Sequence, residues 1–345
     1  MNDVPFHNVY FTGIVRDKLG RKMSKTLGNS PNPLDLIAQY GADAVRIGML
    51  LCSSAGNDIF YDESQVEQGR NFCNKIWNSF RLVKGWTVDA GAQQPEAASV
   101  AVEWFKNRLN QTIELVEDHY SKFRISDALM AIYKLFWDDY CAWYLELVKP
   151  AFGAGIDKVT YDATLGFFEN LLKLIHPVMP FITEELWQNM DDRKAGDTIM
   201  YQPSPVAGKY DSKVISDFEI AAASVMNIRA ARQEKGISPK ETLNVNVDNS
   251  FPKSVIPVLN KLANVNVSSE EASGAGISYM VGVCKLFVAL EGMVNVEQEL
   301  EKLKQDLAYQ QKFLAGVRAK LSNEKFVAHA PQAVIDTERK KEADA

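Results

Sequence analysis

The chain has 345 residues, of which 46% are hydrophobic and 24% charged, so it can bury a core in two or three domains. Its formal net charge of −6 excludes a general attraction to nucleic acid, so an RNA partner would have to meet local basic patches. No apolar run reaches the roughly 18 residues of a membrane span, no signal peptide is evident and the four cysteines form no C-x-x-C pair. We therefore expect a cytoplasmic protein with no membrane partner and no metal site.

The first informative segment is a lysine-rich loop with the sequence KMSKTLGN at residues 22–29. Lys22 and Lys25 are compact charges with rotatable donors, which suits a leaving pyrophosphate whose geometry changes during reaction. Ser24 and Thr26 add hydroxyl donors, and the Gly-Asn pair behind them permits a tight turn. Taken alone, such a short motif is more typical of a solvated surface turn.

The surroundings of this loop carry a family resemblance. An apolar β-like run at residues 9–15 precedes it, and a helix that carries YGADAVR at residues 40–46 is expected after it. This order resembles the end of the catalytic domain in class I aminoacyl-tRNA synthetases of the Ile/Leu/Val/Met subgroup. The family's loop usually ends in Ser, and Thr26 keeps the hydroxyl. The resemblance implies that both lysines stabilise charge on the pyrophosphate of ATP with Mg²⁺, while the two hydroxyls order the loop.

A basic helix is expected next, because residues 69–86 hold four basic side chains and no acid. Polar residues at spacings of three and four share one of its faces: Asn71, Asn74, Asn78 and Arg81. A solvated face is an equally good interpretation of the asparagines. The sequence GRNFCNKIWNSFRL resembles a segment of the valyl enzymes that opens the anticodon-binding region. By that resemblance Arg81 is the best candidate for an anticodon contact, Lys84 is expected on phosphates, and the further candidates Asn74, Trp77 and Asn78 complete the site, the first two mainly by holding the helix in place.

Residues 100–189 have the apolar periodicity of a four-helix bundle. The segment HPVMPFITEELW at residues 176–187 resembles the hallmark of the subgroup's anticodon-binding bundle. We expect the aromatic side chains to form core rather than ligand platforms, and His176 to be structural. Glu184 and Glu185 are expected to cap the N-terminus of the last helix.

The pattern then changes to a small α+β module. A helix at residues 218–235 is expected to expose Arg229, Arg232 and Lys235. Strands are expected at 243–247 and 265–267, with one or two more across 277–290, and a short helix at 255–262 is expected to be interrupted at Pro257. The arginine face is as consistent with solvation as with function.

The last 53 residues show heptads. Apolar side chains alternate at spacings of three and four: Met293, Val296, Leu300, Leu303, Leu307, Leu314, Val317 and Leu321. A basic tip follows, and it resembles the coiled-coil arm of valyl-tRNA synthetases, which braces the tRNA. The resemblance implies nucleic-acid contacts by Arg318, Lys320 and Lys325.

We therefore predict a mainly α chain with four parts. These are the end of a Rossmann-type catalytic domain with the lysine loop (1–50), a helical anticodon-binding domain (51–215), a small α+β linker module (216–290) and a truncated coiled-coil arm (291–345). No His-x-Gly-His adenine-binding motif is present. The resemblance implies the C-terminal part of an ATP-dependent ligase that attaches valine to its tRNA through a valyl adenylate.

By that resemblance the partners are valine-specific tRNA, with ATP and valine for the full-length enzyme, and no DNA. The fragment itself is expected to bind tRNA without catalysing the reaction. Two alternatives stay open: a stand-alone, non-catalytic tRNA-binding or scaffold protein, and another nucleotidyltransferase with a similar lysine loop.

Overall fold

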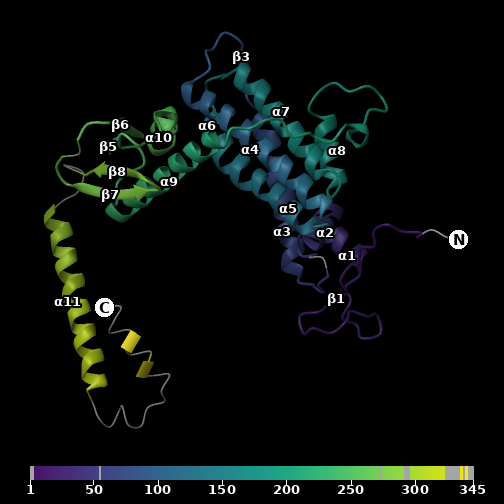
Figure 1. Cartoon of the computed structure of the whole chain (residues 1–345), viewed down its shortest axis with the longest axis horizontal. Helices are drawn as coiled ribbons and strands as arrows, with labels where there is room; N and C mark the ends of the chain where they lie inside the picture. The colour runs from purple at the N-terminus through teal and green to yellow at the C-terminus, as the bar shows by residue number, and fades with distance from the viewer. Residues whose placement is uncertain are drawn as a thin grey trace.

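The computed structural model describes residues 4–53, 56–271, 273–290, 296–322, 335–336 and 339–340, without the side chains of 296–303 and 306. Figure 1 shows a helical bundle with the N-terminal segment at one end. A small mixed module lies beside the other end, and one long helix leads away from that module (Figure 1). The mainly helical fold class predicted from the sequence is confirmed.

The N-terminal segment is built around two short strands. β1 (Val15–Arg16) pairs in parallel with β2 (Ile59–Phe60). Between them in the chain lie the lysine loop and two helices, α1 (Pro33–Tyr40) and α2 (Ala42–Leu51). Pro33 occupies the first position of α1, where a missing N–H costs nothing, and the Asn32 side chain accepts the Leu34 N–H as a cap.

Two expectations for this segment are wrong. In the apolar run at 9–15 only Val15 belongs to a strand. Residues 9–14 form none, because no strand among the described residues pairs with them, and Phe11 is 78% exposed. The helix through YGADAVR is broken at Gly41, whose φ of 91° lies in the left-handed region that only glycine adopts easily. One expected helix is therefore two.

The bundle is built from the next helices in the chain. They are α3 (Glu63–Lys84), α4 (Glu96–Ser121), α5 (Ile125–Lys134), the π-helical segment η1 (Leu135–Tyr144), α6 (Leu145–Val148), α7 (Lys158–Ile175) and α8 (Pro180–Gln188). At the end far from the lysine loop, β3 (Val88–Asp89) pairs in parallel with β4 (Ile156–Asp157). A short 3-10 turn, η2 (Ile199–Tyr201), follows α8.

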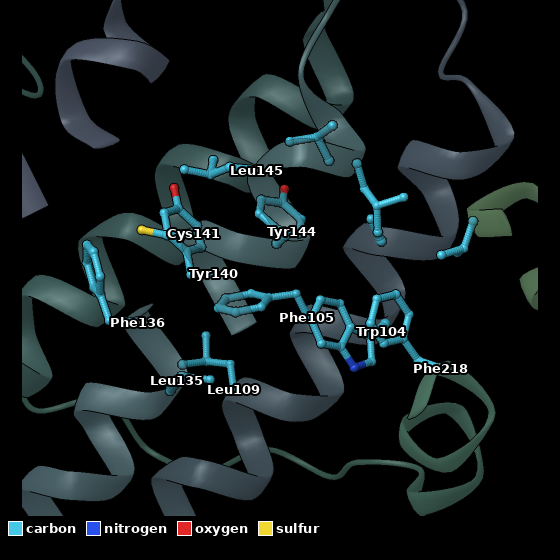
Figure 2. Close-up of a cluster of buried hydrophobic side chains, with 14 of the residues drawn as sticks. Trp104, Phe105, Leu109, Leu135, Phe136, Tyr140, Cys141, Tyr144, Leu145 and Phe218 are labelled. Carbon is cyan, nitrogen blue, oxygen red and sulfur yellow. The ribbon is translucent and has the colours of Figure 1, made fainter. Parts of the chain in front are cut away.

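Aromatic side chains fill the bundle core (Figure 2). Trp104 of α4 stacks on Phe218 with ring centroids 3.6 Å apart. Tyr140 and Tyr144 of η1 are fully buried, and their hydroxyls reach α7, where the Tyr144 hydroxyl lies 2.8 Å from the Thr164 hydroxyl. Buried phenols need such partners, so the aromatic residues act as core, as the sequence indicated.

The α+β module starts with a long helix, α9 (Ser212–Lys235). Its sheet has the order β6 (Val265–Ser268), β5 (Leu243–Val247), β8 (Cys284–Ala289) and β7 (Gly276–Val281), with β5 and β6 parallel and the other neighbours antiparallel. The 3-10 turn η3 (Lys253–Val255) and α10 (Ile256–Ala263) connect β5 to β6. The alternating strands expected in this region are confirmed.

Two details of the module differ from expectation. Pro257 lies in the first turn of α10 and begins that helix rather than interrupting one, since the first turn needs no N–H donor there. Arg232 is not exposed but 5% accessible, because its guanidinium binds main-chain carbonyl oxygens at the end of α10.

The C-terminal helix, α11, spans Val296–Leu321. On the expected heptad seam Val317 is buried, Leu314 is half-buried and Leu307 is exposed. Lys325 and the turn expected after Leu321 lie outside the described residues. Pairing of this helix into a coiled coil stays a prediction.

A pair of charged side chains on α2 fastens the N-terminal segment to the bundle. The Asp43 carboxylate accepts the main-chain N–H groups of Phe181 and Ile182 at 3.4 and 2.7 Å, across 138 and 139 residues of sequence. Arg46 donates from Nε to the Val178 carbonyl at 2.7 Å and from Nη2 to the Pro177 carbonyl at 3.1 Å. We call these four bonds the Asp43–Arg46 clamp.

The clamp replaces the helix cap that the sequence suggested. Asp43 supplies the acceptors at the N-terminus of α8, where exposed N–H groups and the helix dipole favour a carboxylate. The expectation that Glu184 and Glu185 do so is wrong, because both lie beyond the first turn. Glu184 instead accepts the Ile199 N–H and the Thr198 hydroxyl of the next turn.

Two glycines allow α2 and α3 to approach closely behind the clamp. A Cβ atom at Gly69 would lie 2.2 Å from the Ala44 carbonyl oxygen, and one at Gly48 would lie 2.6 Å from the Gln65 carbonyl oxygen. No side chain fits at such distances from main-chain atoms. The N-terminal segment is therefore joined to the bundle by main-chain packing as well as by the clamp.

Replacing Asp43 tests the clamp. We predict that Asp43→Ala lowers the free energy of unfolding by about 1–2 kcal/mol, the usual loss for a helix cap, because two N–H groups lose their acceptor. Asp43→Asn keeps an acceptor oxygen and should cost less. Urea denaturation of both variants makes the measurement, and equal losses for Ala and Asn would contradict the capping role.

The pH dependence gives a second readout of the same site. Burial raises the pKa of Asp43, so the folded protein holds this proton to higher pH than the unfolded chain does. Ionisation of Asp43 therefore lowers the free energy of unfolding of the wild type as pH rises through and above about 4. Asp43→Asn has no group that ionises there and shows no such loss. The stability of Asp43→Asn relative to wild type should rise from pH 4 to pH 7, and a fall would contradict the account.

Candidate functional site

The lysine loop is held at its base by one asparagine. Asn29 Oδ1 accepts the Ser24 N–H at 2.9 Å, while Asn29 Nδ2 donates to Asp17 Oδ2 at 2.9 Å and to the Lys22 carbonyl at 3.3 Å. Ser24 Oγ accepts the Leu27 N–H at 3.2 Å. These bonds close the loop on itself, so its backbone is set by its own side chains.

Asp17 anchors that asparagine. It is 9% exposed, and its carboxylate accepts the N–H groups of Leu19 and Arg21 as well as the Arg21 guanidinium. The hydrogen bonds from Asn29 and Arg21 hold the pKa of Asp17 well below its usual range. Asp17 is therefore a charged acceptor across the physiological pH range and is fully used inside the loop.

The cationic tips of the loop stay exposed. Lys22 bridges Arg16 through its main chain, and Gly28, with φ +63°, turns back so that its N–H reaches the Lys25 carbonyl at 3.1 Å. The side chains of Lys22, Lys25 and Thr26 are exposed, and within the described ranges neither lysine forms an ion pair. The arrangement presents two ammonium groups and a hydroxyl on an anchored backbone, which suits a polyphosphate.

The asparagine stripe of α3 is exposed as the spacing predicted. Asn71, Asn74, Asn78 and Arg81 all face solvent, opposite the buried face of Phe72 and Ile76. Arg81 makes no side-chain hydrogen bond or ion pair within the described part of the chain. Trp77 is 41% exposed. The structure thus brings these candidates together on one surface.

The other basic residues of α3 have internal partners. Arg70 pairs with Glu67 at 3.5 Å and lies over the Tyr40 ring, and Lys75 lies over the Trp137 ring. Lys84 Nζ donates to the Met190 carbonyl at 3.1 Å, which ties the end of α3 to the segment after α8. Lys84 therefore has a structural contact in addition to the phosphate role that the sequence suggested.

An exposed aromatic side chain at the far end of the bundle was missed from sequence. Phe152 is fully exposed in the loop after α6. It lines a hollow of about 420 Å³ with Trp86 and Lys149. The signal in the sequence is a phenylalanine between Pro150 and Gly153, where a core residue is out of place.

The remaining candidates lie on the arm. Arg318 and Lys320 are exposed on the last turn of α11, and Lys325 is outside the described residues. Within the parts of the chain that the structure describes, no group of three His, Cys, Asp or Glu side chains could hold a metal ion. No helix among them is long and apolar enough to cross a membrane.

Replacing Asn29 tests the loop geometry. We predict that Asn29→Ala speeds amide hydrogen exchange of Ser24 on the order of tenfold, because the loop loses its central acceptor and donor. Thr26→Ala is the matched control, since the structure gives the Thr26 side chain no hydrogen bond. Unchanged exchange at Ser24 in Asn29→Ala would show that the loop is held by something else.

Comparisons with known proteins agree with these features. Three family models match: "tRNA synthetases class I (I, L, M and V)" over residues 1–62, "Anticodon-binding domain of tRNA ligase" over 102–247 and "Valyl tRNA synthetase tRNA binding arm" over 295–345. Proteins named valine–tRNA ligase from Phocaeicola vulgatus, Parabacteroides distasonis and Bacteroides thetaiotaomicron are 55%, 53% and 52% identical, each over 99% of this chain.

The matched region is 39%, 39% and 40% of those three proteins, so the chain spans about two fifths of the length of these relatives. The family models match segments that hold both the lysine loop and the arm. The chain therefore belongs to the valine–tRNA ligase family and corresponds to the C-terminal portion of its longer members.

Proposed function

We propose that the chain is the tRNA-binding, C-terminal part of an ATP-dependent ligase that joins valine to its tRNA through a valyl adenylate. The observation that carries this proposal is the placement of the exposed lysine loop and the exposed α3 stripe on one frame joined by the Asp43–Arg46 clamp. A protein that activates an amino acid and reads a tRNA needs both surfaces in a fixed relation. Valine is proposed as the amino acid because the chain is similar to proteins named valine–tRNA ligase.

In the first step, the lysine loop would meet the phosphates of ATP. Lys22 and Lys25 would stabilise the charge that develops on pyrophosphate as it leaves, and Thr26 would donate a further hydrogen bond. Ser24 and Asn29 hold the loop in shape. The residues present fit a polyphosphate, whose own charge the two exposed ammonium groups complement.

The described residues offer no comparable set of ligands for Mg²⁺. Asp17 is the carboxylate that holds the loop, and its oxygens accept bonds from Leu19, Arg21 and Asn29. Among the described residues no carboxylate cluster could replace it. Ligands for Mg²⁺ would therefore have to come from ATP or from outside the described residues.

In tRNA binding, α3 and the far end of the bundle would act together. Arg81 can stack on a base and donate hydrogen bonds in a fixed fork, so it would supply base preference. Phe152 offers a solvent-exposed ring at the end of the bundle where α3 ends, which suits stacking on an unpaired base. Lys84 would act on phosphates without base preference.

The alternative of a stand-alone scaffold is less well supported. The similarity to the ligases includes the lysine loop, and a scaffold has no need for two exposed lysines on an internally anchored turn. A different nucleotidyltransferase would not need the anticodon-binding match over 102–247.

A binding titration tests the proposal. We predict that the chain binds valine-specific tRNA with an affinity that falls steeply with salt, and that Arg81→Ala costs about 1–3 kcal/mol on that tRNA. The loss should be smaller on a copy whose anticodon is exchanged. Lys84→Ala is the control of equal charge change and should weaken both tRNAs alike. Equal losses of affinity for Arg81→Ala on the two tRNAs would contradict the proposal, because Arg81 would then contribute charge without base preference.

A further inference from the structure

A second basic site lies away from the α3 stripe, between the ends of α9 and α10. It is a cavity of about 530 Å³ whose charged lining residues are Arg229, Arg232 and Lys261, and no carboxylate lines it. The three cations come from two helices that meet at their C-terminal ends. Like charges that line one cavity repel each other, so their convergence without an acid in the lining needs a reason.

Part of that reason is structural. Arg232 donates to the carbonyls of Ala263 and Asn264 at 2.9 and 3.0 Å, and Arg229 donates to the Leu262 carbonyl at 3.0 Å. These oxygens are the ones left unpaired at the C-terminus of α10, where the helix dipole favours positive charge. The two arginines therefore cap α10.

Capping leaves donors and charge unused. A guanidinium carries five N–H groups, and Arg229 uses one of them on a protein acceptor that the structure records. Arg232 is only 5% exposed, and its buried Nε has no hydrogen-bond partner. None of the three cations forms an ion pair within the residues described, and the negative charges of Glu241 and Glu146 favour the charged forms of Arg232 and Lys261 without pairing with them. Lys261 takes no part in the cap, because its Nζ donates to the Lys149 carbonyl, so the cap alone does not account for three charges.

A contact of Lys261 shows that this cavity lies at the far end of the bundle. Its Nζ donates to the Lys149 carbonyl at 3.1 Å, in the loop that carries Phe152. In Figure 1 α10 lies against the bundle near α6, on the side away from the lysine loop. Burial of the Lys261 stem lowers the pKa of its ammonium group, and a bound anion would offset that cost. The cavity is thus next to the hollow of Trp86 and Phe152.

We propose that the cavity lined by Arg229, Arg232 and Lys261 binds a phosphate group, and that this phosphate is a phosphodiester of the tRNA backbone. The second half rests on the proposed function, since it takes tRNA as the partner of the bundle. A free phosphate ion would satisfy the same donors, so the shared chemistry is a phosphate oxyanion. The consequence is that the α+β module is part of the RNA-binding surface and not only a linker.

The first experiment measures the salt dependence of tRNA binding for two charge-matched variants. Arg229→Gln/Lys261→Gln removes two cations of the cavity and leaves the buried Arg232 in place. Lys240→Gln/Lys253→Gln removes two exposed cations of the same module for which the structure records no side-chain contact. The cavity variant should lower the slope of log affinity against log salt by about one and weaken binding on the order of tenfold, while the control stays near wild type. Equal slopes for the two variants overturn the proposal.

A charge-preserving variant separates phosphate binding from helix capping. Arg229→Lys/Lys261→Arg keeps both charges but changes the geometry of the bonds to Leu262 and Lys149. Thermal unfolding should report any loss of the cap, while the salt slope should stay near the wild-type value. A slope that falls together with the melting temperature in this variant means that stability, and not phosphate contact, controls binding, which contradicts the proposal.

Inorganic phosphate distinguishes the two sources of the ligand. At constant ionic strength, phosphate in place of chloride should raise the melting temperature of the wild type and not that of Arg229→Gln/Lys261→Gln, and tRNA should compete with it. If the wild type binds no tRNA, the proposed function fails. A phosphate-specific shift that the cavity variant loses would then assign the cavity to free phosphate and overturn the backbone assignment. No shift, with unchanged tRNA binding in the cavity variant, would overturn the site altogether.

Discussion

The buried carboxylate of Asp43 at the N-terminus of α8 is the contact on which the rest of this structure depends. It satisfies two N–H groups that the helix cannot satisfy itself, and Arg46 satisfies the two carbonyls just before them. Burying a charge is costly, but here the helix dipole and two donors surround it. As a result α2, which follows the lysine loop in the chain, has one position on the bundle.

That position gives the two candidate surfaces a fixed relation. The lysine loop is anchored through Asp17 and Asn29 at one end of the molecule, and α3 carries Arg81 toward the other end. Gly48 and Gly69 let the main chains of α2 and α3 approach until no side chain fits between them. The lysine side chains are exposed, whereas hydrogen bonds hold their backbone, and this division suits a loop that follows a changing phosphate geometry.

Sequence patterns predicted the features that depend on residues close together in the chain. They failed for contacts between segments that are far apart in the chain. The exposed face of α3 and the strands of the module follow from spacings of three to four and of two, so they could be predicted. The cap of α8 could not, because Asp43 reaches it across 138 residues. Arg232 looked exposed for the same reason: its partners are carbonyls of α10, about thirty residues away. The phosphate-handling role of the loop stays a prediction from its residue types and from family resemblance, and the contacts of Asn29 show how the backbone of the loop is held.

The most direct test of the account is native-state hydrogen exchange across the clamp. If Asp43 and Arg46 fasten the N-terminal segment to the bundle, the amides of Ile47 and Gly48 in α2 should open with the same free energy as those of Leu171 and Leu172 in α7, within about 1 kcal/mol. An opening free energy for α2 several kcal/mol below that of α7 would contradict the account, because the lysine loop would then belong to a segment that moves independently of the bundle.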